Sequence, residues 1–337
     1  MFAAVALRTP LDVSPWPQVR VAAAEHGFKL TTLEDVDSAE PREVLVIADT
    51  WDRRVQRAVA KGATLAVLLS FDPPVLAWQL YYDLEKISAR FAHTFLWEGA
   101  RERVAPITWF HPLYAPVPCP PQRPTGLPWT SRGFLVAVHD NHALPRHVSI
   151  PRLIAGLRYR PIARERYQAR LRAFEAFAKR DDFDLFGKGW GRREPSVAPE
   201  LHAAAVRAYR GEANDRPGLL AKYRFALVYE STRFPGYISD LILDCFFARC
   251  IPIYSGAPDI AQYIPPSAFI DVRQFQSFPE LERFLVRTTE DDARRYVDAA
   301  HAFLISPAFE SWCAERFARD LVEALLHLRA AADANGL

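Results

Sequence analysis

The sequence predicts an α/β protein with two domains, each a parallel sheet covered by helices. Short apolar runs alternate with helical stretches through the first hundred residues and again after residue 133. Between these series, residues 111–129 hold seven of the 27 prolines of the chain. Proline at this density forms neither a helix interior nor a central strand, so we interpret the segment as a semi-rigid connector. The 337 residues suffice for two domains of average size.

The amino-terminal series predicts a doubly wound domain over residues 1–111, followed by a linker over residues 112–132. Its most regular run, residues 44–48, is wholly apolar, which is typical of a parallel strand buried on both faces. The expected strands are residues 3–7, 28–30, 44–48, 65–69 and 93–97, and the expected helices are residues 16–26, 51–61 and 73–90.

The second series predicts a domain over residues 133–306. A final helical segment, residues 307–337, is expected to pack back towards the first domain. The expected strands are residues 134–138, 183–186, 225–229, 251–254 and 269–272, and the expected helices are residues 164–180, 238–248, 291–304 and 309–332.

The composition is that of a soluble globular enzyme, with half of the residues apolar and 24% charged. The 42 basic and 40 acidic residues leave a net charge of +2, which gives no case for nucleic acid as the main partner. No apolar run approaches about 18 residues, so no membrane span is expected, although the sequence allows peripheral membrane contact. The amino-terminal apolar run is too short for a signal peptide.

The four cysteines show no spacing typical of metal ligands. Cys245 and Cys250 flank an apolar segment and are expected to be buried free thiols. The positions of Cys119 and Cys313 imply no disulfide framework. These observations favour a reducing cytoplasm.

The most informative stretch is residues 222–272. An apolar run ends on a carboxylate, Glu230, and a polar loop with Gly236 as its flexible point leads into a helical segment. A second apolar run then stops at Ser255 and Gly256. This order of strand, loop, helix and strand is the unit of a parallel sheet that carries ligand loops at its carboxyl edge.

The same stretch resembles the donor-binding motif of the family 10 glycosyltransferases, the α1,3/4-fucosyltransferases. The match is close over about fifty residues and looser upstream to about residue 134. The resemblance implies a GT-B-type fold, with two Rossmann-like domains facing a central cleft. It also implies an inverting, metal-independent transfer of fucose from GDP-fucose to a hydroxyl of a glycan or glycolipid, without a further cofactor. The motifs that carry it are Tyr223-Arg224-Phe225, Tyr229-Glu230-Ser231, Tyr237-Ile238-Ser239-Asp240 and Pro252-Ile253-Tyr254.

The polar residues of this stretch form the expected donor site. Glu230 is placed to accept sugar or ribose hydroxyls, and residues 236–239 to present backbone N–H groups to phosphate. Ser239 is a plausible N-cap and Asp240 lies in the first turn of the helix. The alternative is that Glu230 only satisfies loop amides and that the other two only cap the helix. The donor-binding residues we predict are Glu230, Ser231, Arg233, Gly236, Tyr237, Ser239, Asp240 and Lys188.

One departure from the family pattern concerns charge. Leu241 stands where the family has a lysine that contacts the diphosphate. Either another cation replaces this lysine, or donor affinity is low, or the donor differs. Arg233 in the donor loop and Lys188 after a predicted strand are second-choice cations.

Arg164 is the first-choice cation and a predicted catalytic residue. Its spacing from Tyr167 resembles the family's arginine at the start of a helix, which contacts the diphosphate. An arginine there suits phosphate oxygens and the charge that develops on the leaving GDP. The alternative is a solvated basic helix face that includes Arg166 and Arg170.

Glu98 is the predicted catalytic base. It ends a predicted strand, and Trp97-Glu98-Gly99 resembles the short acidic motif of the family. The alternative is an ion pair with Arg101 or Arg103. The other candidates near the cleft are the reserve carboxylates Asp49 and Asp52, the loop histidines His139 and His142, and the aromatic residues Trp51, Trp78, Tyr81, Tyr82, Trp97 and Trp109, most of which are expected in the core.

The sequence therefore predicts a fucosyltransferase-like enzyme. One alternative is the same scaffold with another nucleotide-sugar donor, motivated by Leu241. The other is a degenerate protein that binds glycan or nucleotide without turnover.

Overall fold

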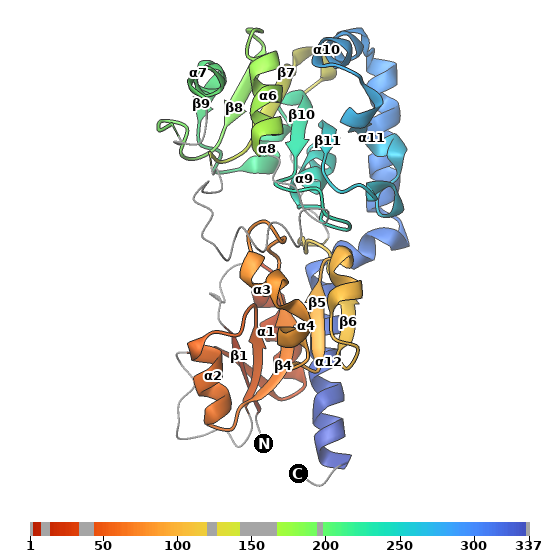
Figure 1. Cartoon of the computed structure of the whole chain (residues 1–337). Helices are drawn as coiled ribbons and strands as arrows, with labels where there is room; N and C mark the ends of the chain where they lie inside the picture. Colours follow the sequence, from red (N-terminus) through yellow and green to blue (C-terminus); the bar gives the residue numbers. More distant parts are fainter. Residues whose placement is uncertain are drawn as a thin grey trace. The chain divides into compact units, whose positions relative to one another are not determined.

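The computed structural model describes residues 3–7, 14–33, 44–119, 127–141, 167–193 and 198–334. It divides into two compact units (Figure 1). Unit 1 comprises residues 1–120 and 310–337, and unit 2 comprises residues 121–309. Each unit contains a six-stranded sheet, and the paired strands are parallel throughout. The predicted α/β class is confirmed.

The sheet of unit 1 has the strand order β2-β1-β3-β4-β5-β6. Its strands are β1 (Ala3–Leu7), β2 (Phe28–Thr32), β3 (Val44–Ala48), β4 (Thr64–Leu69), β5 (His93–Leu96) and β6 (Trp109–Pro112). Its helices are α1 (Trp16–Glu25), α2 (Arg53–Ala60), α3 (Trp78–Tyr82), α4 (Leu84–Ser88), the 3-10 helix η1 (Glu98–Arg103) and α12 (Ala314–Ala334).

The carboxyl-terminal helix α12 belongs to unit 1, where it packs against α1 and β4. The ring of Phe317 on α12 lies 6.4 Å from the ring of Trp16 and 6.0 Å from that of Phe95. Burial of such aromatic rings makes α12 an integral part of the core of unit 1.

Two sequence predictions in unit 1 are wrong. Residues 73–90 do not form one helix, because the N–H groups of Leu76 and Ala77 donate to the carbonyl of Pro73 in a turn, and α3 and α4 meet at Asp83. The predicted linker also begins inside the sheet, since Pro112 ends the strand β6. A proline is tolerated there because β6 lies at the edge of the described sheet.

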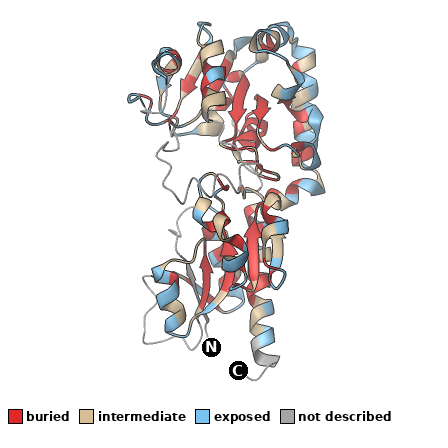
Figure 2. Ribbon diagram, viewed as in Figure 1, coloured by how far each residue is buried: buried red, intermediate tan, exposed pale blue. Residues whose placement is uncertain are grey.

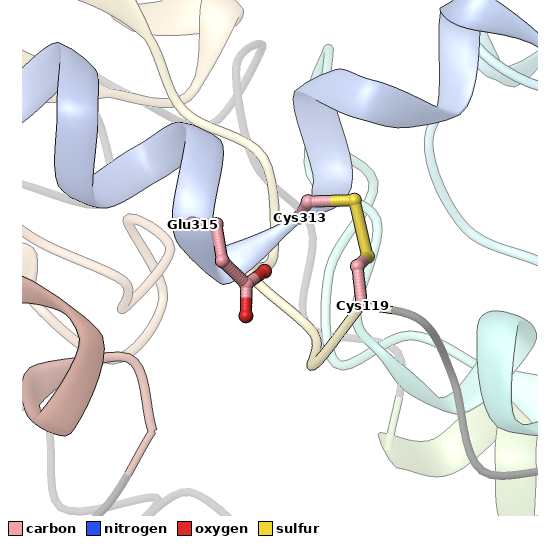
Figure 3. Close-up of side chains that lie close together, drawn as sticks. All are labelled: Cys119, Cys313 and Glu315. Carbon is pink, nitrogen blue, oxygen red and sulfur yellow. A yellow bond between two sulfur atoms is a disulfide. The ribbon is translucent and has the colours of Figure 1, made fainter.

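The expectation that the cysteines form no disulfide is also wrong. Cys119 and Cys313 are joined, with Cα atoms 5.5 Å apart (Figure 3). Beside this bond, the Val117 N–H donates to the Trp312 carbonyl at 2.8 Å. Cys245 and Cys250 are buried free thiols, as predicted. Since disulfides persist in oxidising surroundings, the cysteines no longer favour a reducing cytoplasm.

The sheet of unit 2 has the strand order β12-β11-β10-β7-β8-β9. Its strands are β7 (Gly133–Val138), β8 (Phe183–Phe186), β9 (Tyr209–Gly211), β10 (Tyr223–Tyr229), β11 (Ile251–Ser255) and β12 (Ile270–Asp271). Its α-helices are α6 (Tyr167–Phe177), α7 (Pro199–Ala208), α8 (Arg216–Leu220), α9 (Leu241–Phe247), α10 (Phe278–Arg287) and α11 (Glu290–Leu304). Its 3-10 helices are η2 (Trp129–Ser131), η3 (Ile260–Gln262), η4 (Pro266–Ala268) and η5 (Val272–Gln274), and η6 (Pro307–Trp312) spans the unit boundary.

The core of unit 2 is formed by these strands together with the inner faces of α6, α7 and α10. In both units the strands are largely buried, and the exposed residues lie mainly on helices and loops (Figure 2). The described helices include none that is long and apolar enough to cross a membrane.

Candidate nucleotide-sugar site

The strand order of unit 2 identifies one place where polar loops converge. Counted from β7, the order is 3-2-1-4-5-6, so the chain reverses its direction across the sheet between β7 and β10. In open parallel sheets, ligands bind at the carboxyl ends of the strands beside such a switch point. His139 and Glu230 directly follow β7 and β10 there.

Glu230 is a buried carboxyl group at this edge, with 4% of its surface exposed. Its Oε1 accepts a hydrogen bond from the backbone N–H of Ser239 at 2.8 Å, and its own N–H donates to the carbonyl of Ser255 at 2.9 Å. A Cβ atom on Gly256 would overlap the side chains of Glu230 and Tyr254, so only glycine allows this close approach.

The environment of Glu230 changes its protonation. Burial raises the pKa of Glu230 to about 7, although the hydrogen bonds from Ser239 and the nearby Arg170 lower it. Near neutral pH the carboxyl group is therefore present in both forms, and it can accept or donate a hydrogen bond. Both roles suit the recognition of hydroxyl groups.

His139 connects β7 to β10 and to helix α6. Its Nε2 lies 3.0 Å from the Leu227 carbonyl oxygen, and its Nδ1 lies 3.4 Å from Nη1 of Arg170. Burial and the charge of Arg170 lower the pKa of His139 well below its usual value. The neutral ring then donates from Nε2 and accepts at Nδ1, so it orients the Arg170 guanidinium at the switch point.

Arg170 is therefore a cation that the fold brings to His139, and its charge also lowers the pKa of Glu230. The cation predicted from the sequence to bind phosphate, Arg164, lies outside the described residues, and Arg170 was predicted only as part of a basic helix face. In the sequence, the run of arginines before and within α6 indicates a basic segment. Which of these arginines lies at the switch point depends on the topology of the sheet and cannot be read from the sequence.

Asp240 is held by Arg216, an arginine that no motif in the sequence had indicated. Arg216 at the start of α8 contacts Oδ2 of Asp240 at 2.6 Å and also bonds Oδ2 of Asp244. Burial lowers the pKa of Arg216, and the two aspartates raise it by more. Burial also raises the pKa of Asp244 to about 6, against the effect of Arg216. This ion triad joins α8 to α9.

The start of α9 differs from the prediction. The helix begins at Leu241 with Asp240 at the N-cap position and no side-chain cap, so Ser239 is not the N-cap. The N–H group of Gly236 donates to Asp259, and that of Ser239 donates to Glu230. The N–H group of Tyr237 is also bonded within the loop. These three N–H groups already donate to acceptors within the protein. The prediction that they bind phosphate is therefore wrong.

The remaining predicted donor residues lie in two loops at the same edge. Ser231 Oγ lies 3.4 Å from the hydroxyl of Tyr237. Arg233 is half-buried in this loop. Lys188 follows β8 with an exposed side chain, and its N–H donates to Oδ1 of Asp140 at 2.7 Å.

The predicted base, Glu98, lies in unit 1 after β5. Its carboxylate pairs with Arg101, at 2.5 Å from Nε and 3.0 Å from Nη2, and its side chain is 33% exposed. This ion pair is the alternative role predicted for Glu98 from the sequence. It engages both carboxylate oxygens, so an acceptor hydroxyl would have to share one of them.

Other candidates in unit 1 have structural contacts. Asp52 caps α2 by accepting from the N–H groups of Arg54 and Val55. The buried Trp97 donates to the Phe71 carbonyl. His142, which the sequence analysis placed in a loop near the cleft, lies outside the described residues.

Comparison with known proteins shows what this part of the chain is similar to. Residues 163–313 match the model of the glycosyltransferase family 10 (fucosyltransferase) carboxyl-terminal domain. Residues 163–313 of this chain are therefore similar to that domain family. Over 86 residues the chain is 34% identical to alpha-(1,3)-fucosyltransferase FucT of Helicobacter pylori, a match that spans 25% of this chain and 18% of that protein. The predicted resemblance of the domain is confirmed.

Solved structures share the fold at low identity. A crystal structure of alpha1,3-fucosyltransferase has a TM-score of 0.55 at 14% identity, over 96% of this chain and 90% of that one. A structure of alpha1,3-fucosyltransferase with GDP has a TM-score of 0.51 at the same identity and coverage. Alr3699/HepE of Anabaena in complex with UDP has a TM-score of 0.59 at 12% identity, over 97% of this chain and 100% of that one. The chain therefore has the GT-B fold.

Proposed function

We propose that this protein is an inverting, metal-independent glycosyltransferase that transfers fucose from GDP-fucose to a hydroxyl of a glycan or glycolipid. One observation carries the proposal: the family 10 match, residues 163–313, contains the buried Glu230 and the Arg170 guanidinium at the switch point of the sheet. A structure of alpha1,3-fucosyltransferase with GDP shares this fold, which supports a guanine nucleotide as the leaving group.

The donor would be held by hydrogen bonds to its hydroxyl groups and by positive charges beside its diphosphate. Glu230, with its pKa of about 7, suits a ribose or sugar hydroxyl. Arg170 and Arg233 suit the diphosphate, because a guanidinium binds phosphate oxygens through paired hydrogen bonds. Arg164 remains a proposed third cation and Lys188 a fourth. Their positive charge would stabilise the charge that develops on the departing GDP.

The surroundings of Leu241 give a physical account of its apolar side chain. It is 6% exposed and packs in the core of unit 2, so this position does not present a charge to a ligand. The cation beside Asp240 comes instead from Arg216. Two carboxylates offset the charge of Arg216, so we assign it to holding the corner between α8 and α9, and we assign phosphate binding to Arg170 and Arg233.

Transfer with inversion requires one base and one displacement. Glu98 would accept the proton of the acceptor hydroxyl while the oxygen attacks the anomeric carbon. The bond from that carbon to the β-phosphate oxygen breaks, and its electron pair leaves with GDP. Arg101 would orient the carboxylate for this role.

A second candidate donor is a uridine nucleotide sugar. Two observations favour it: Leu241 departs from the family pattern, and the fold is shared with a protein solved with UDP. A donor screen separates the two, with GDP-fucose, UDP-glucose and UDP-N-acetylglucosamine offered with a panel of glycan acceptors. Release of GDP coupled to product supports the first proposal, and release of UDP alone supports the second.

The same protein preparation tests for binding without turnover. Calorimetry with GDP should show saturable binding to the wild type and weaker binding to Arg170→Ala. Saturable GDP binding with no product from any donor would reject the enzyme and leave the nucleotide-binding alternative.

A further inference from the structure

Unit 1 has a groove of about 530 Å³ between the edge strand β6 and helix α12. This volume lies within the range of sites that bind small ligands. All of the residues that line the groove belong to unit 1, in which β5, β6 and α12 run alongside one another (Figure 1). Among the described residues, none of those proposed for donor binding or catalysis lines the groove, so it is open to a further role.

The floor of the groove is one face of the sheet. The register of β5 and β6 pairs His93 with Trp109 and Phe95 with His111, and side chains two residues apart on a strand share a face. The rings of Phe95 and His111 are stacked, with centroids 4.3 Å apart and planes inclined by 8°. Trp109 is 62% exposed, so this large aromatic side chain offers most of its surface to a ligand.

Helix α12 forms the facing wall and supplies hydrogen-bonding groups. The wall residues Asp320, Glu323 and His327 follow one another at i, i+3 and i+7, which is one face of the helix. Burial lowers the pKa of His111, and the charges of Asp320 and Glu323 act against it, so both carboxylates lie close to the sheet. Asp320 pairs with Arg316 at 2.7 Å, whereas no hydrogen bond or ion pair joins Glu323 to another described residue.

The groove leads from Trp109 towards the predicted base. Pro112 at the end of β6 is paired with Leu96 at the end of β5. Tyr114, which lines the groove, and Glu98 each follow their strand by two residues, so they reach the same edge of the sheet. Burial raises the pKa of Tyr114, and the charge of Glu98 raises it further, as expected of close neighbours. A ligand in the groove therefore extends to the surroundings of Glu98.

We propose that this groove binds an extended glycan chain, as a subsite for the sugar units next to the one whose hydroxyl reacts at Glu98. A sugar ring can stack its apolar face on Trp109 and donate hydroxyl hydrogen bonds to Glu323 and Asp320. Two carboxylates beside the single guanidinium of Arg316 favour a neutral glycan over an anionic one. The inference rests on the proposed function, to which it adds a preference for long acceptors.

The test measures affinity against chain length. Neutral oligosaccharides of hexose and N-acetylhexosamine units, from di- to hexasaccharides, are offered to the full chain on an array, and the series that binds best is carried into calorimetry. The wild type should bind the hexasaccharide more tightly than the disaccharide. Trp109→Ala and Glu323→Gln should each weaken hexasaccharide binding about tenfold, by loss of stacking or of a charged hydrogen-bond acceptor. Their affinity for the disaccharide should stay close to that of the wild type, which also shows that the variants fold.

Two matched controls change exposed side chains that do not line the groove. Ile107→Ala, two residues before Trp109, and Glu315→Gln, on α12, should bind the hexasaccharide as the wild type does. In transfer assays, Trp109→Ala and Glu323→Gln should raise the KM for the hexasaccharide and leave kcat and the KM for GDP-fucose unchanged.

The outcomes separate this inference from the proposed function. Absence of transfer with every donor would reject the proposed function, whereas the binding comparison would still test the groove. The inference is overturned if the wild type binds the hexasaccharide no more tightly than the disaccharide. It is also overturned if Trp109→Ala and Glu323→Gln both bind the hexasaccharide as tightly as the wild type does.

Discussion

Both sheets of this protein are six-stranded and parallel, but the candidate acidic residues of the two units differ in burial. In unit 2 the acidic groups Glu230 and Asp244 are buried, and burial raises the pKa of both. In unit 1 the predicted base, Glu98, is partly exposed and ion-paired. A buried carboxyl group loses water and must be held by fixed partners, whereas an exposed one can change partners at little cost.

The match to the family 10 model lies in one of the two units. Residues 163–313 lie almost wholly in unit 2, the unit that contains the buried Glu230. Unit 1 is instead closed by a covalent bond between Cys119 and Cys313 and by the packing of α12. On the proposed function, unit 2 would supply a preorganised donor site and unit 1 an adaptable edge for the acceptor.

The largest expected effect is that of replacing Glu98, the partly exposed carboxylate of unit 1. Glu98→Gln should lower kcat about 1000-fold, because a general base typically contributes about 10²–10⁴ in rate. GDP affinity should stay unchanged, since the proposed donor residues lie in unit 2. Steady-state kinetics and calorimetry measure the two. Glu102→Gln, on the same 3-10 helix, is the control, and a fully active Glu98→Gln protein would remove Glu98 from the mechanism.

The next largest expected effect is the loss of stability when the Cys119–Cys313 disulfide of unit 1 is removed. Replacing Cys119 and Cys313 by serine should lower the free energy of unfolding by about 3 kcal/mol, because the disulfide constrains the unfolded chain. The bonded residues are 194 positions apart in the sequence. Urea unfolding under oxidising conditions measures the loss. A reductant should destabilise the wild type and leave the double variant unaffected; equal responses would show that this bond contributes nothing.

The buried edge of unit 2 predicts a pH dependence of stability. The pKa of Glu230 is raised from the usual 4.5 to about 7, so the folded protein holds a proton that the unfolded chain releases between these values. The stabilisation is complete below the unfolded pKa and is lost as the pH rises through the folded one, by about 3 kcal/mol.

The variant Glu230→Gln isolates this contribution. Its unfolding free energy should fall less than that of the wild type as the pH rises from about 5 to about 8. Glu212→Gln, which changes an exposed carboxyl group in the same unit, should behave as the wild type does. Parallel pH profiles for Glu230→Gln and the wild type would mean that Glu230 does not titrate in this range.

The ion triad of unit 2 predicts a smaller loss of stability. Arg216→Met leaves Asp244 buried without its cation and should cost about 2 kcal/mol, a value reduced for the partial exposure of the arginine. Adding Asp244→Asn should restore most of the loss, as urea unfolding of the single and double variants can show. Additive losses in the double variant would contradict the coupling.

The smallest expected effect concerns the donor phosphates. Arg170→Ala should weaken GDP binding about tenfold, by loss of charge-assisted hydrogen bonds worth about 1.5 kcal/mol. Arg172→Ala changes an exposed arginine on the same helix and should bind GDP normally. Arg164→Ala and Arg233→Ala belong in the same assay. If Arg170→Ala and Arg172→Ala bind alike, the phosphate ligand is one of these other arginines.

Much of the fold could be predicted from the sequence because it follows from local patterns. Apolar runs such as residues 44–48 and 225–229 are buried on both faces, which a parallel sheet requires. The boundaries of α9 and the break between α3 and α4 were not recoverable. Hydrogen bonds in turns and side-chain packing set those boundaries. Hydrophobic periodicity predicts neither of them.

The sequence by itself determined the α/β class and, through the motif around Glu230, the resemblance of residues 163–313 to the family 10 glycosyltransferase domain. Only the tertiary structure decided which charges meet. The charge of Arg170 acts on Glu230 because Arg170 contacts His139 after β7, the strand beside β10, and Arg216 meets Asp240 because α8 packs against α9. Burial and electrostatic coupling depend on distances in space, and residues far apart in the chain acquire them only when the sheet assembles.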